Sequence, residues 1–516
     1  MKGGSFMIEI LTPKQMREAE QASVKLGVSL AQLMDNAGEM LGREVLRFAQ
    51  EKMLRNIVIL IGNGNNGGDG SVCTNFLAES GVDVTVVKMC GEPKTELSKA
   101  VFEKIHNEIK VISCEDADFD EVIEKAEIIV DCVFGTGFHG EIREKNMPYF
   151  EKVSASKAYK IGCDVPSGVN SDNGYVSNGT IKCIKTITFH RAKLGLFLSP
   201  AKDYCGEIIV KDIKIPDGWE KFVSGNILKP SFDEIKVFLP KRNRNSHKGT
   251  YGKLMLVCGC ENYMGAAFIS ASAALRSGVG IGNLCTPKSV VPALVSAMPE
   301  CVLTGLIPNK EGYISSENID KLIELSKSAK AMVIGCGLGV CKDTEKMVCE
   351  LIKNVNCPII LDADGINCLS EHIDILKEKQ GEIILTPHPA ELARLCNVNL
   401  AEVLSNRVEY AKSLANKYGV TVHAKGTQTI TVTADAKCYL TDFGNTALAK
   451  GGSGDMLAGL IGSFIAQGIA FDNSCILASC LMGKTAEILA KENSERGILA
   501  RDIINAFPKV LKEWEE

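Results

Sequence analysis

Short apolar runs alternate with amphipathic stretches along the first 215 residues. The stretch 12–50 is predicted to be helical, because Thr12 and Gln15 have capping-box spacing around Pro13. Continuous apolar strands that alternate with helices predict a parallel sheet covered on both faces. The predicted strands are 56–61, 83–87, 110–113, 127–131, 159–164, 185–189 and 207–210.

A second α/β series begins at residue 253. A helix of small residues is predicted at 265–277, another helix opens at Gly452, and the apolar run 456–471 reads as a buried helix too short to span a bilayer. The pattern fades over 216–232, so the domains are predicted as 8–215 and 233–516, with 216–232 as the linker. The predicted strands are 253–258, 331–334, 358–361, 382–386 and 420–424, followed by a hairpin of 429–433 and 437–441.

Composition is that of a globular chain, with 45% hydrophobic and 23% charged residues and a net charge of -5. The absence of a basic stripe argues against a nucleic-acid partner, and the N-terminus lacks the apolar segment of a signal peptide. The 20 cysteines are scattered without any CxxC pair, which favours reduced thiols over disulfides or zinc. We therefore expect a cytoplasmic protein that binds no membrane.

The first chemical motif, IGNGNNGGDG at 61–70, follows a predicted strand and opens a helix. Gly62, Gly64 and Gly67 satisfy the GxGxxG pattern of dinucleotide folds, which alone is weak. An NAD oxidoreductase also needs an acidic residue at the end of the second strand, where this chain has Lys88. The redox interpretation therefore weakens, while anion binding at a helix N-terminus remains open.

Two further strand ends carry oxygen ligands, in DCVFGTGFHG at 131–140 and DVPSG at 164–168. With Asn66 and Asp69 they could converge at one edge of the sheet, and carboxylate, amide and hydroxyl oxygens suit a hard cation. The alternative for each aspartate taken singly is helix capping.

NNGGDG, DCVFGTGFHG, CDVPSGVNSDNG and the upstream LMDNAG together resemble the NAD(P)H-hydrate epimerase family over about residues 8–215. The resemblance implies a Rossmann-like three-layer αβα sandwich, a potassium ion held by Asn66, Asp131 and Ser167, and Asp164 as the acid/base. Asp35 stands where a glutamate is more usual, and its role stays open. His139 and His190 are expected at the surface or in packing rather than as catalysts. The implied contacts to the hydrate are Asn65, Asn66, Gly67, Gly68, Asp69, Gly135, Thr136, Gly137, Phe138, His139, Gly140, Glu141 and Asp164.

The motif KGGSGD at 450–455 opens the apolar helix of the second half. Small residues before a helix expose backbone amides to a phosphate, whose charge the helix dipole favours. Helix capping by Asp455 is the simpler alternative. The chain has no Walker A motif, which excludes P-loop chemistry. Further polar turns occur at 262–266, 335–339, 362–367, 386–391 and 425–429.

This set resembles the ribokinase-like superfamily, and within it the ADP/ATP-dependent NAD(P)H-hydrate dehydratases, over about residues 230–510. The chain departs from the pattern with GCGLG in place of GPGLG and with Ala449-Lys450 in place of Ala-Thr. The resemblance implies Asp455 as the general base and Mg²⁺ with ADP or ATP, held through water by Asp362, Asp364 or Glu391. The implied nucleotide ligands are Lys425, Gly426, Thr427, Gln428, Thr429 and Gly454, and the implied hydrate contacts are Ala266, Gly337, His388 and Asp455.

The predicted function is therefore nicotinamide nucleotide repair by an isomerase and a lyase on one chain. The expected partners are NADHX, NADPHX and ADP or ATP, with ADP favoured, and the chain is expected to form a homo-oligomer. Two alternatives remain. The N-terminal half could be a catalytically silent binding module, or the C-terminal half could be an ordinary small-molecule kinase.

Overall fold

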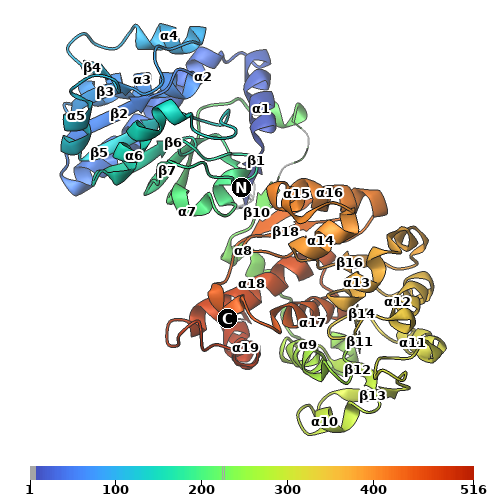
Figure 1. The fold of residues 1–516 in the computed structure, drawn as a ribbon. Coiled ribbons are helices and arrows are strands. Elements are labelled where there is room, and N and C mark those ends of the chain that lie inside the picture. Colours follow the sequence, from blue (N-terminus) through green and yellow to red (C-terminus); the bar gives the residue numbers. More distant parts are fainter. Residues whose placement is uncertain (1–6, 224, 226, 516) are drawn as a thin grey trace. The chain divides into compact units, whose positions relative to one another are not determined.

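The computed structural model describes residues 7–223, 225 and 227–515. It divides into two compact units, Ile8–Ile227 and a C-terminal unit that starts at Leu228 (Figure 1). This division falls inside the segment predicted as a linker, 216–232, of which residues 224 and 226 lie outside the described residues.

The N-terminal unit is built on a seven-stranded parallel sheet of order β4-β3-β2-β5-β6-β7-β9. Alternate residues of β2 face opposite sides: Ile57, Ile59 and Ile61 join one apolar core, and Val58 and Leu60 join the other. This explains the continuous apolar run, because both faces of the strand are buried. The strands are β1 (Ile8–Leu11), β2 (Asn56–Ile61), β3 (Asp83–Lys88), β4 (Lys110–Ser113), β5 (Ile128–Cys132), β6 (Tyr159–Cys163), β7 (Lys185–Phe189), β8 (Ala192–Lys193) and β9 (Glu207–Lys211).

The stretch predicted to be helical, 12–50, contains two helices, α1 (Pro13–Lys25) and α2 (Leu30–Lys52). The prediction did not include the break between them. Gly27, at φ +96°, turns the chain there, and Ser29 caps α2. The predicted capping box of Thr12 and Gln15 is confirmed. The remaining helices of the unit are α3 (Asn65–Glu79), α4 (Glu96–Phe102), α5 (Phe119–Lys125), α6 (Met147–Ala155) and α7 (Lys202–Cys205).

The polar strand ends of the N-terminal unit meet at one edge of the sheet. Strand β2 pairs with β5 so that Ile61 lies opposite Cys132, and β5 pairs with β6 so that Asp131 lies opposite Gly162. The strand predicted over 159–164 ends one residue early, at Cys163, because Asp164 has φ +62°, a left-handed conformation that a strand cannot contain.

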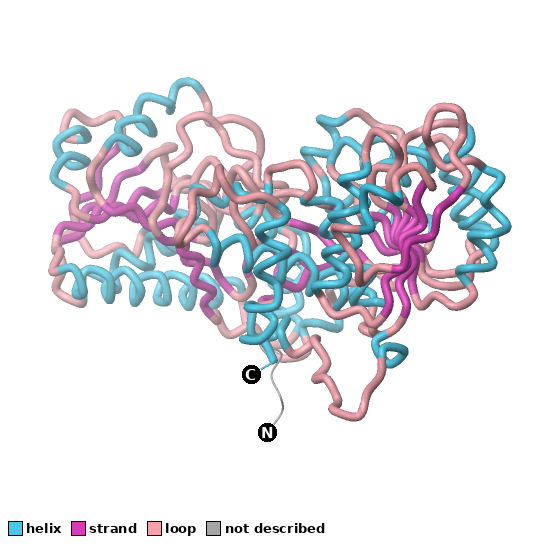
Figure 2. Tube along the Cα trace, turned by 90° about the horizontal axis from the view of Figure 1, so that it is seen from below, coloured by secondary structure: helices cyan, strands magenta, loops and turns pink. Residues whose placement is uncertain are grey.

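The C-terminal unit has the strand order β13-β12-β11-β14-β15-β16-β17-β18-β19. The strands are parallel from β13 to β17, and β18 and β19 follow as an antiparallel hairpin beside β17. Helices lie on either side of this strand layer (Figure 2). Strands β12 and β13 were not predicted, because Gly282, Asn283 and Pro287 interrupt the apolar pattern of β12. The strands are β10 (Ile227–Lys229), β11 (Lys253–Val257), β12 (Ile281–Pro287), β13 (Val302–Leu306), β14 (Ala331–Ile334), β15 (Ile359–Leu361), β16 (Ile383–Leu385), β17 (Thr421–Ala424), β18 (Thr429–Val432) and β19 (Cys438–Thr441).

Helix α17 is buried against β11 and β14 and contacts α9 and α18. The buried helix predicted over 456–471 is present but ends earlier: α17 ends at Ala466, Gly468 follows at φ +89°, and α18 begins at Phe471. Among the described helices, none is both long and apolar enough to cross a membrane. The helices are α8 (Phe232–Lys236), α9 (Met264–Arg276), α10 (Val291–Val295), α11 (Ile319–Ser326), α12 (Lys342–Asn354), α13 (Asp364–Ser370), α14 (Pro389–Cys396), α15 (Leu400–Ser405), α16 (Arg407–Tyr418), α17 (Ser453–Ala466), α18 (Phe471–Leu489) and α19 (Ala500–Glu515).

The segment predicted as linker is packed at both ends. Trp219 is buried in the core of the N-terminal unit, while Leu228 and Phe232 pack against the core of the C-terminal unit. The sequence pattern did not predict this packing, because a few apolar residues in a mixed polar segment do not form a periodic pattern.

Candidate active sites

A cavity of about 790 Å³ opens at the carboxyl edge of the N-terminal sheet. Parallel sheets bind ligands at this edge, where the strands end and the helices begin. Most of the residues predicted to contact a ligand line this cavity: Asn65, Asn66, Asp69, Gly135, Thr136, Gly137, Phe138, His139, Glu141 and Asp164.

Gly67, Gly68 and Gly140 are not part of the cavity lining. A Cβ atom on Gly67 would lie 2.1 Å from the carbonyl oxygen of Gly62, and one on Gly68 would lie 2.6 Å from Sδ of Met34. Close packing of the α3 N-terminus therefore explains these two glycines, and Gly140 occupies a turn at φ +78°.

Asp131 and Ser167 form a buried hydrogen-bonded pair close to the strand ends, and Asn66 lines the cavity. The Ser167 backbone N–H donates to Asp131 Oδ2 at 2.7 Å and its hydroxyl donates to Oδ1 at 2.5 Å. Asn66 Nδ2 is buried and has no hydrogen-bond partner among the described residues, and a Cβ on Gly135 would lie 3.1 Å from Asn66 Oδ1. Burial raises the pKa of Asp131 to about 6, although hydrogen bonds from Ser167 oppose the shift. In the part of the chain that the structure describes, Asp131 has no ion-pair partner.

Asp164 lies beside a buried lysine that the sequence analysis missed. Lys193 Nζ donates to Asp164 Oδ1 at 2.5 Å, and the Thr188 hydroxyl donates to the same oxygen at 2.9 Å. The Lys193 side chain is only 1% exposed, and its ammonium also donates to Thr188 Oγ1 and to the Phe189 carbonyl, both at 3.0 Å. All three ammonium hydrogens therefore have acceptors, so the ammonium is held in one position and in turn holds the Asp164 carboxylate.

Two further carboxyl groups face this ion pair, those of Glu20 and Asp69. Burial raises the pKa of both, and Lys193 opposes the shift in each case while Asp164 adds to it. Glu20 also lines the cavity. The only sequence sign of Lys193 is a lysine within an apolar stretch, and Glu20 on the amphipathic α1 gives no sign at all.

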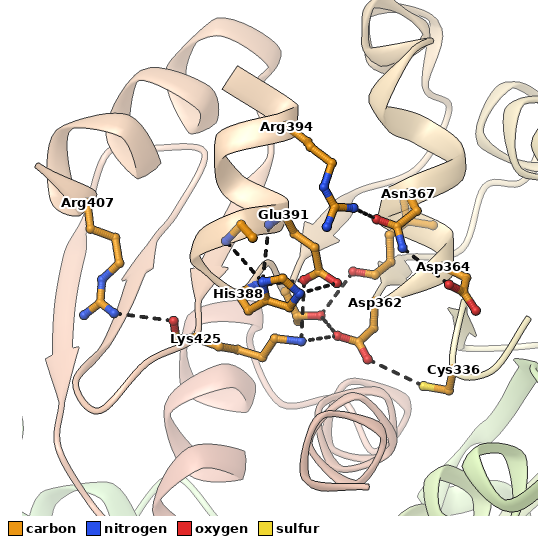
Figure 3. Close-up of polar contacts among 12 residues, drawn as sticks. Cys336, Asp362, Asp364, Asn367, His388, Glu391, Arg394, Arg407 and Lys425 are labelled. Carbon is orange, nitrogen blue, oxygen red and sulfur yellow. Dashed lines mark hydrogen bonds and ion pairs between the residues drawn. The ribbon is translucent and has the colours of Figure 1, made fainter. Parts of the chain in front are cut away.

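The second polar group lies at the carboxyl edge of the C-terminal sheet, around Asp362 (Figure 3). Lys425 Nζ and the Thr386 hydroxyl both donate to Asp362 Oδ1 at 2.6 Å. Burial lowers the pKa of Lys425, but Asp362 and Glu391 more than offset this and raise it. Lys425 is therefore a fixed cation at the start of the loop 425–429.

Asp455 lies in the first turn of α17 and is half-buried. Burial, with repulsion from Asp362, raises its pKa to about 6, and the neighbouring Cys336 thiol opposes the shift. A Cβ on Gly454 would lie 3.4 Å from Lys425 Nζ, so the helix N-terminus meets the 425–429 loop at this lysine. A carboxylate with this pKa is a suitable general base at neutral pH.

The other predicted residues of this site surround the same edge. A Cβ on Gly337 would lie 2.8 Å from the Ala266 Cβ, so these two residues are in contact. His388 caps α14, with its Nδ1 accepting from the Ala390 and Glu391 amides at 3.2 and 3.3 Å. Burial raises the pKa of Glu391 to about 7. Asp364 instead accepts from the Gly339 amide at 2.8 Å, which fixes the 335–339 turn.

Arg407 is a second residue that the sequence analysis missed. Its guanidinium donates to the Lys425 carbonyl at 3.4 Å and to the Gln428 carbonyl (Figure 3 labels Arg407 and Lys425). Burial lowers its pKa to about 10. Lys450, one of the two departures from the resembled pattern, instead donates to the Arg496 and Ile498 carbonyls at 2.5 and 2.7 Å. It therefore anchors a loop, whereas Arg407 shapes the 425–429 turn.

Comparison with known proteins matches both units. The family described as NAD(P)H-hydrate dehydratase matches residues 254–509, and the family described as YjeF-related protein N-terminus matches residues 30–195. A bifunctional NAD(P)H-hydrate repair enzyme of Thermofilum pendens is 32% identical over 503 residues, covering 96% of this chain and 94% of the relative. The chain belongs to the bifunctional NAD(P)H-hydrate repair enzyme family. The Escherichia coli member is 31% identical, covering 96% of this chain and 92% of its own.

Solved structures resemble single units of this repair-enzyme chain. An ADP/ATP-dependent NAD(P)H-hydrate dehydratase from Bacillus subtilis, co-crystallised with ATP and Mg²⁺, is 32% identical, covers 55% of this chain and 98% of its own, and has a TM-score of 0.49. The yeast protein ynu0 is 23% identical, covers 44% of this chain and 98% of its own, and has a TM-score of 0.38. The predicted family and the predicted pair of α/β domains are confirmed by the full-length relatives and by the two observed sheets.

Proposed function

We propose that this repair-enzyme chain interconverts the R and S hydrates of NADH and NADPH in its N-terminal unit. Its C-terminal unit dehydrates the S form with a nucleotide phosphate. The observation that carries the proposal is that each sheet edge presents one well-placed aspartate among glycine-bearing turns, Asp164 in one unit and Asp455 in the other.

Epimerisation inverts C6 of the hydrated nicotinamide ring. The C6 hydroxyl must leave or the ring must open, and either route moves one proton off and back on. Asp164 is our choice of acid/base, because it lines the cavity and Lys193 holds its carboxylate in one orientation. The α3 N-terminus, at Asn65 and Asn66, lies in the same cavity wall and is suited to the substrate's phosphates.

We propose potassium as the cation of the N-terminal unit, held by Asn66, Asp131 and Ser167. The donor set fits a hard cation, because it offers carboxylate, hydroxyl and amide oxygens. Asp131 is completely buried without an ion-pair partner among the described residues, so a bound cation would neutralise its charge. When bound there, the ion supplies positive charge beside the 133–140 turn.

Dehydration needs a better leaving group than hydroxide at C6. Asp455 takes the proton of the C6 hydroxyl, whose oxygen attacks the terminal phosphorus of ADP or ATP. A P–O bond forms at the hydrate, and the bond to AMP or ADP breaks. The lone pair of N1 then expels phosphate from C6, and loss of a C5 proton restores the dihydropyridine. Lys425 and the α17 amides supply the fixed positive charge that phosphoryl transfer requires.

The remaining residues that we propose for this site bind the nucleotide or the hydrate. Lys425, Gly426, Thr427, Gln428, Thr429 and Gly454 bind the nucleotide, and Ala266, Gly337 and His388 face the hydrate. Mg²⁺ enters with the nucleotide and neutralises phosphate charge. Asp362, Asp364 and Glu391 are the carboxylates that would hold it through water.

The test is to incubate pure R or pure S hydrate with the full chain, with and without ADP, and to follow the return of reduced-cofactor absorbance. We expect recovery from both epimers only when ADP is present, and R/S exchange without it. A stable phosphorylated product from an unrelated alcohol would establish the kinase alternative. Absence of both K⁺ binding and R/S exchange would establish the silent-module alternative.

A further inference from the structure

Cys336 introduces a thiol into the carboxylate group of the C-terminal unit. Its thiol donates a hydrogen bond to Asp362 Oδ2 at 3.8 Å, and a carboxylate oxygen of Asp455 lies within 4.8 Å of the sulfur (Figure 3 shows the contact to Asp362). One ligand atom from each of Cys336, Asp362 and Asp455 lies within 4.8 Å of the other two. Cys336 follows β14, Asp362 follows β15 and Asp455 lies in the first turn of α17, so the fold brings three separate segments together at one point.

The ligand atoms are oriented toward one another. Asp362 Oδ1 is occupied by Lys425 and Thr386, whereas Oδ2 faces Cys336. Among the described residues, the Cys336 thiol is the only recorded partner of Asp362 Oδ2. Cys258, which follows β11, is a buried neighbour of Cys336, so a second thiol adjoins the group.

The spacing and the donor set fit a tetrahedral, thiophilic ion. Zinc bonds of ~2.3 Å to sulfur and ~2.0 Å to oxygen give a sulfur–oxygen edge of roughly 3.5 Å. The observed 3.8 Å is close to that edge. Thiolate selects zinc-like ions over magnesium, which prefers oxygen ligands and keeps its waters. The charges also favour a cation: two carboxylates and a thiolate lie near Lys425, whose ammonium is shared with Glu391 at 3.9 Å, so a divalent cation would reduce the negative charge of the group.

We propose that Cys336, Asp362 and Asp455 form a binding site for Zn²⁺ or a similar thiophilic divalent cation, with Cys258 adjacent as a further ligand. Binding releases the Cys336 thiol proton to solvent and occupies the Asp455 carboxylate. The cation therefore inhibits dehydration while epimerisation continues. The inhibition, but not the metal binding, rests on the function proposed above.

The binding test uses the chelator-treated full chain without nucleotide, titrated with Co²⁺ as a spectroscopic probe. We expect a thiolate-to-cobalt charge-transfer band and strong tetrahedral visible bands, both removed by Zn²⁺. Cys336→Ser should weaken binding by more than about 100-fold, because losing even a partner of a metal ligand costs about 10–100-fold. Asp455→Asn preserves the side-chain shape and should also weaken binding. The control Cys349→Ser removes a partly buried thiol on α12, outside this group, and should change nothing.

The inhibition test buffers free Zn²⁺ at constant excess Mg²⁺ and measures recovery from S hydrate and R/S exchange together. Each variant is compared with its own metal-free rate. We expect reversible loss of recovery only, and a more than 100-fold higher inhibitory concentration for Cys336→Ser, which follows from the weaker binding above. A missing charge-transfer band, or equal cobalt affinity in Cys336→Ser, overturns the site whatever the activities. Binding without inhibition overturns its effect on catalysis. A zinc-free chain that fails to dehydrate S hydrate although ADP and Mg²⁺ are present instead refutes the proposed function.

Discussion

Replacing Lys193 with methionine removes the only cation that contacts Asp164 through an ion pair in the described residues. Methionine keeps much of the apolar stem and removes the ammonium group. The side chains of Lys193 and Asp164 are 1% and 15% exposed, so water cannot replace the lost partner without rearrangement. Glu20 and Asp69 then face Asp164 without the buried ammonium, and Arg17, which acts on Glu20, is the cation that remains.

The magnitude follows from burial. Removing one partner of a buried ion pair costs about 3–5 kcal/mol when the other stays charged. The remaining carboxylates avoid this cost by taking up a proton, and at 1.36 kcal/mol per pH unit the same energy corresponds to about 2–4 pH units. We therefore expect Lys193→Met to move the acid limb of the epimerisation profile upward by about two pH units. Activity at neutral pH should fall strongly and return in part at alkaline pH.

The assay measures R/S exchange without nucleotide across the pH range, together with S-hydrate dehydration as an internal check on the same sample. The matched control is Lys110→Met, which breaks the 2.7 Å surface pair with Asp118, whose side chain is 57% exposed. That pair should contribute no more than about 1 kcal/mol. An unchanged Lys193→Met profile, or a loss that alkaline pH does not reverse in a folded protein, refutes the positioning role.

The remaining predictions concern one residue each. The dehydration rate should fall tenfold per pH unit below about 6, because Asp455, whose pKa burial raises to about 6, must be deprotonated to act as the base; a flat rate between pH 5 and 7 contradicts this. Arg407→Met should raise the KM for ADP by about tenfold or more with unchanged R/S exchange, since two loop carbonyls lose their donor; an unchanged KM in steady-state kinetics would exclude that role. Asp131→Asn should abolish any stimulation of R/S exchange by K⁺ over Na⁺, and stimulation equal to that of the parent would place the ion elsewhere.

The sequence predicted the sheets well where strands are buried on both faces, as at β2 and β14, because such strands read as unbroken apolar runs. It failed at β12, whose Gly282 and Asn283 are buried only because β11 and β13 flank the strand. It also failed where a single positive φ ends an element, at Gly27 and Gly468. Propensity averaged over a window cannot register one left-handed residue.

For the candidate sites, too, some features could be predicted from the sequence and others could not. Glycine-bearing strand ends predicted the residues at both sheet edges, because parallel strands deliver their carboxyl ends to one side. The partners that tune those residues could not be predicted. Lys193 reaches Asp164 from 29 positions along the chain, and Lys425 reaches Asp362 from 63 positions away, and only the tertiary fold makes each pair adjacent.

The most direct test of the whole account is complementation between two single variants on pure R hydrate. Asp164→Asn should lack epimerisation, and Asp455→Asn should lack dehydration. With ADP, each alone should recover reduced cofactor no faster than uncatalysed R/S exchange allows, whereas an equimolar mixture should restore rapid recovery. Rapid recovery by either variant alone, or no recovery by the mixture, would contradict the assignment of one working aspartate to each unit.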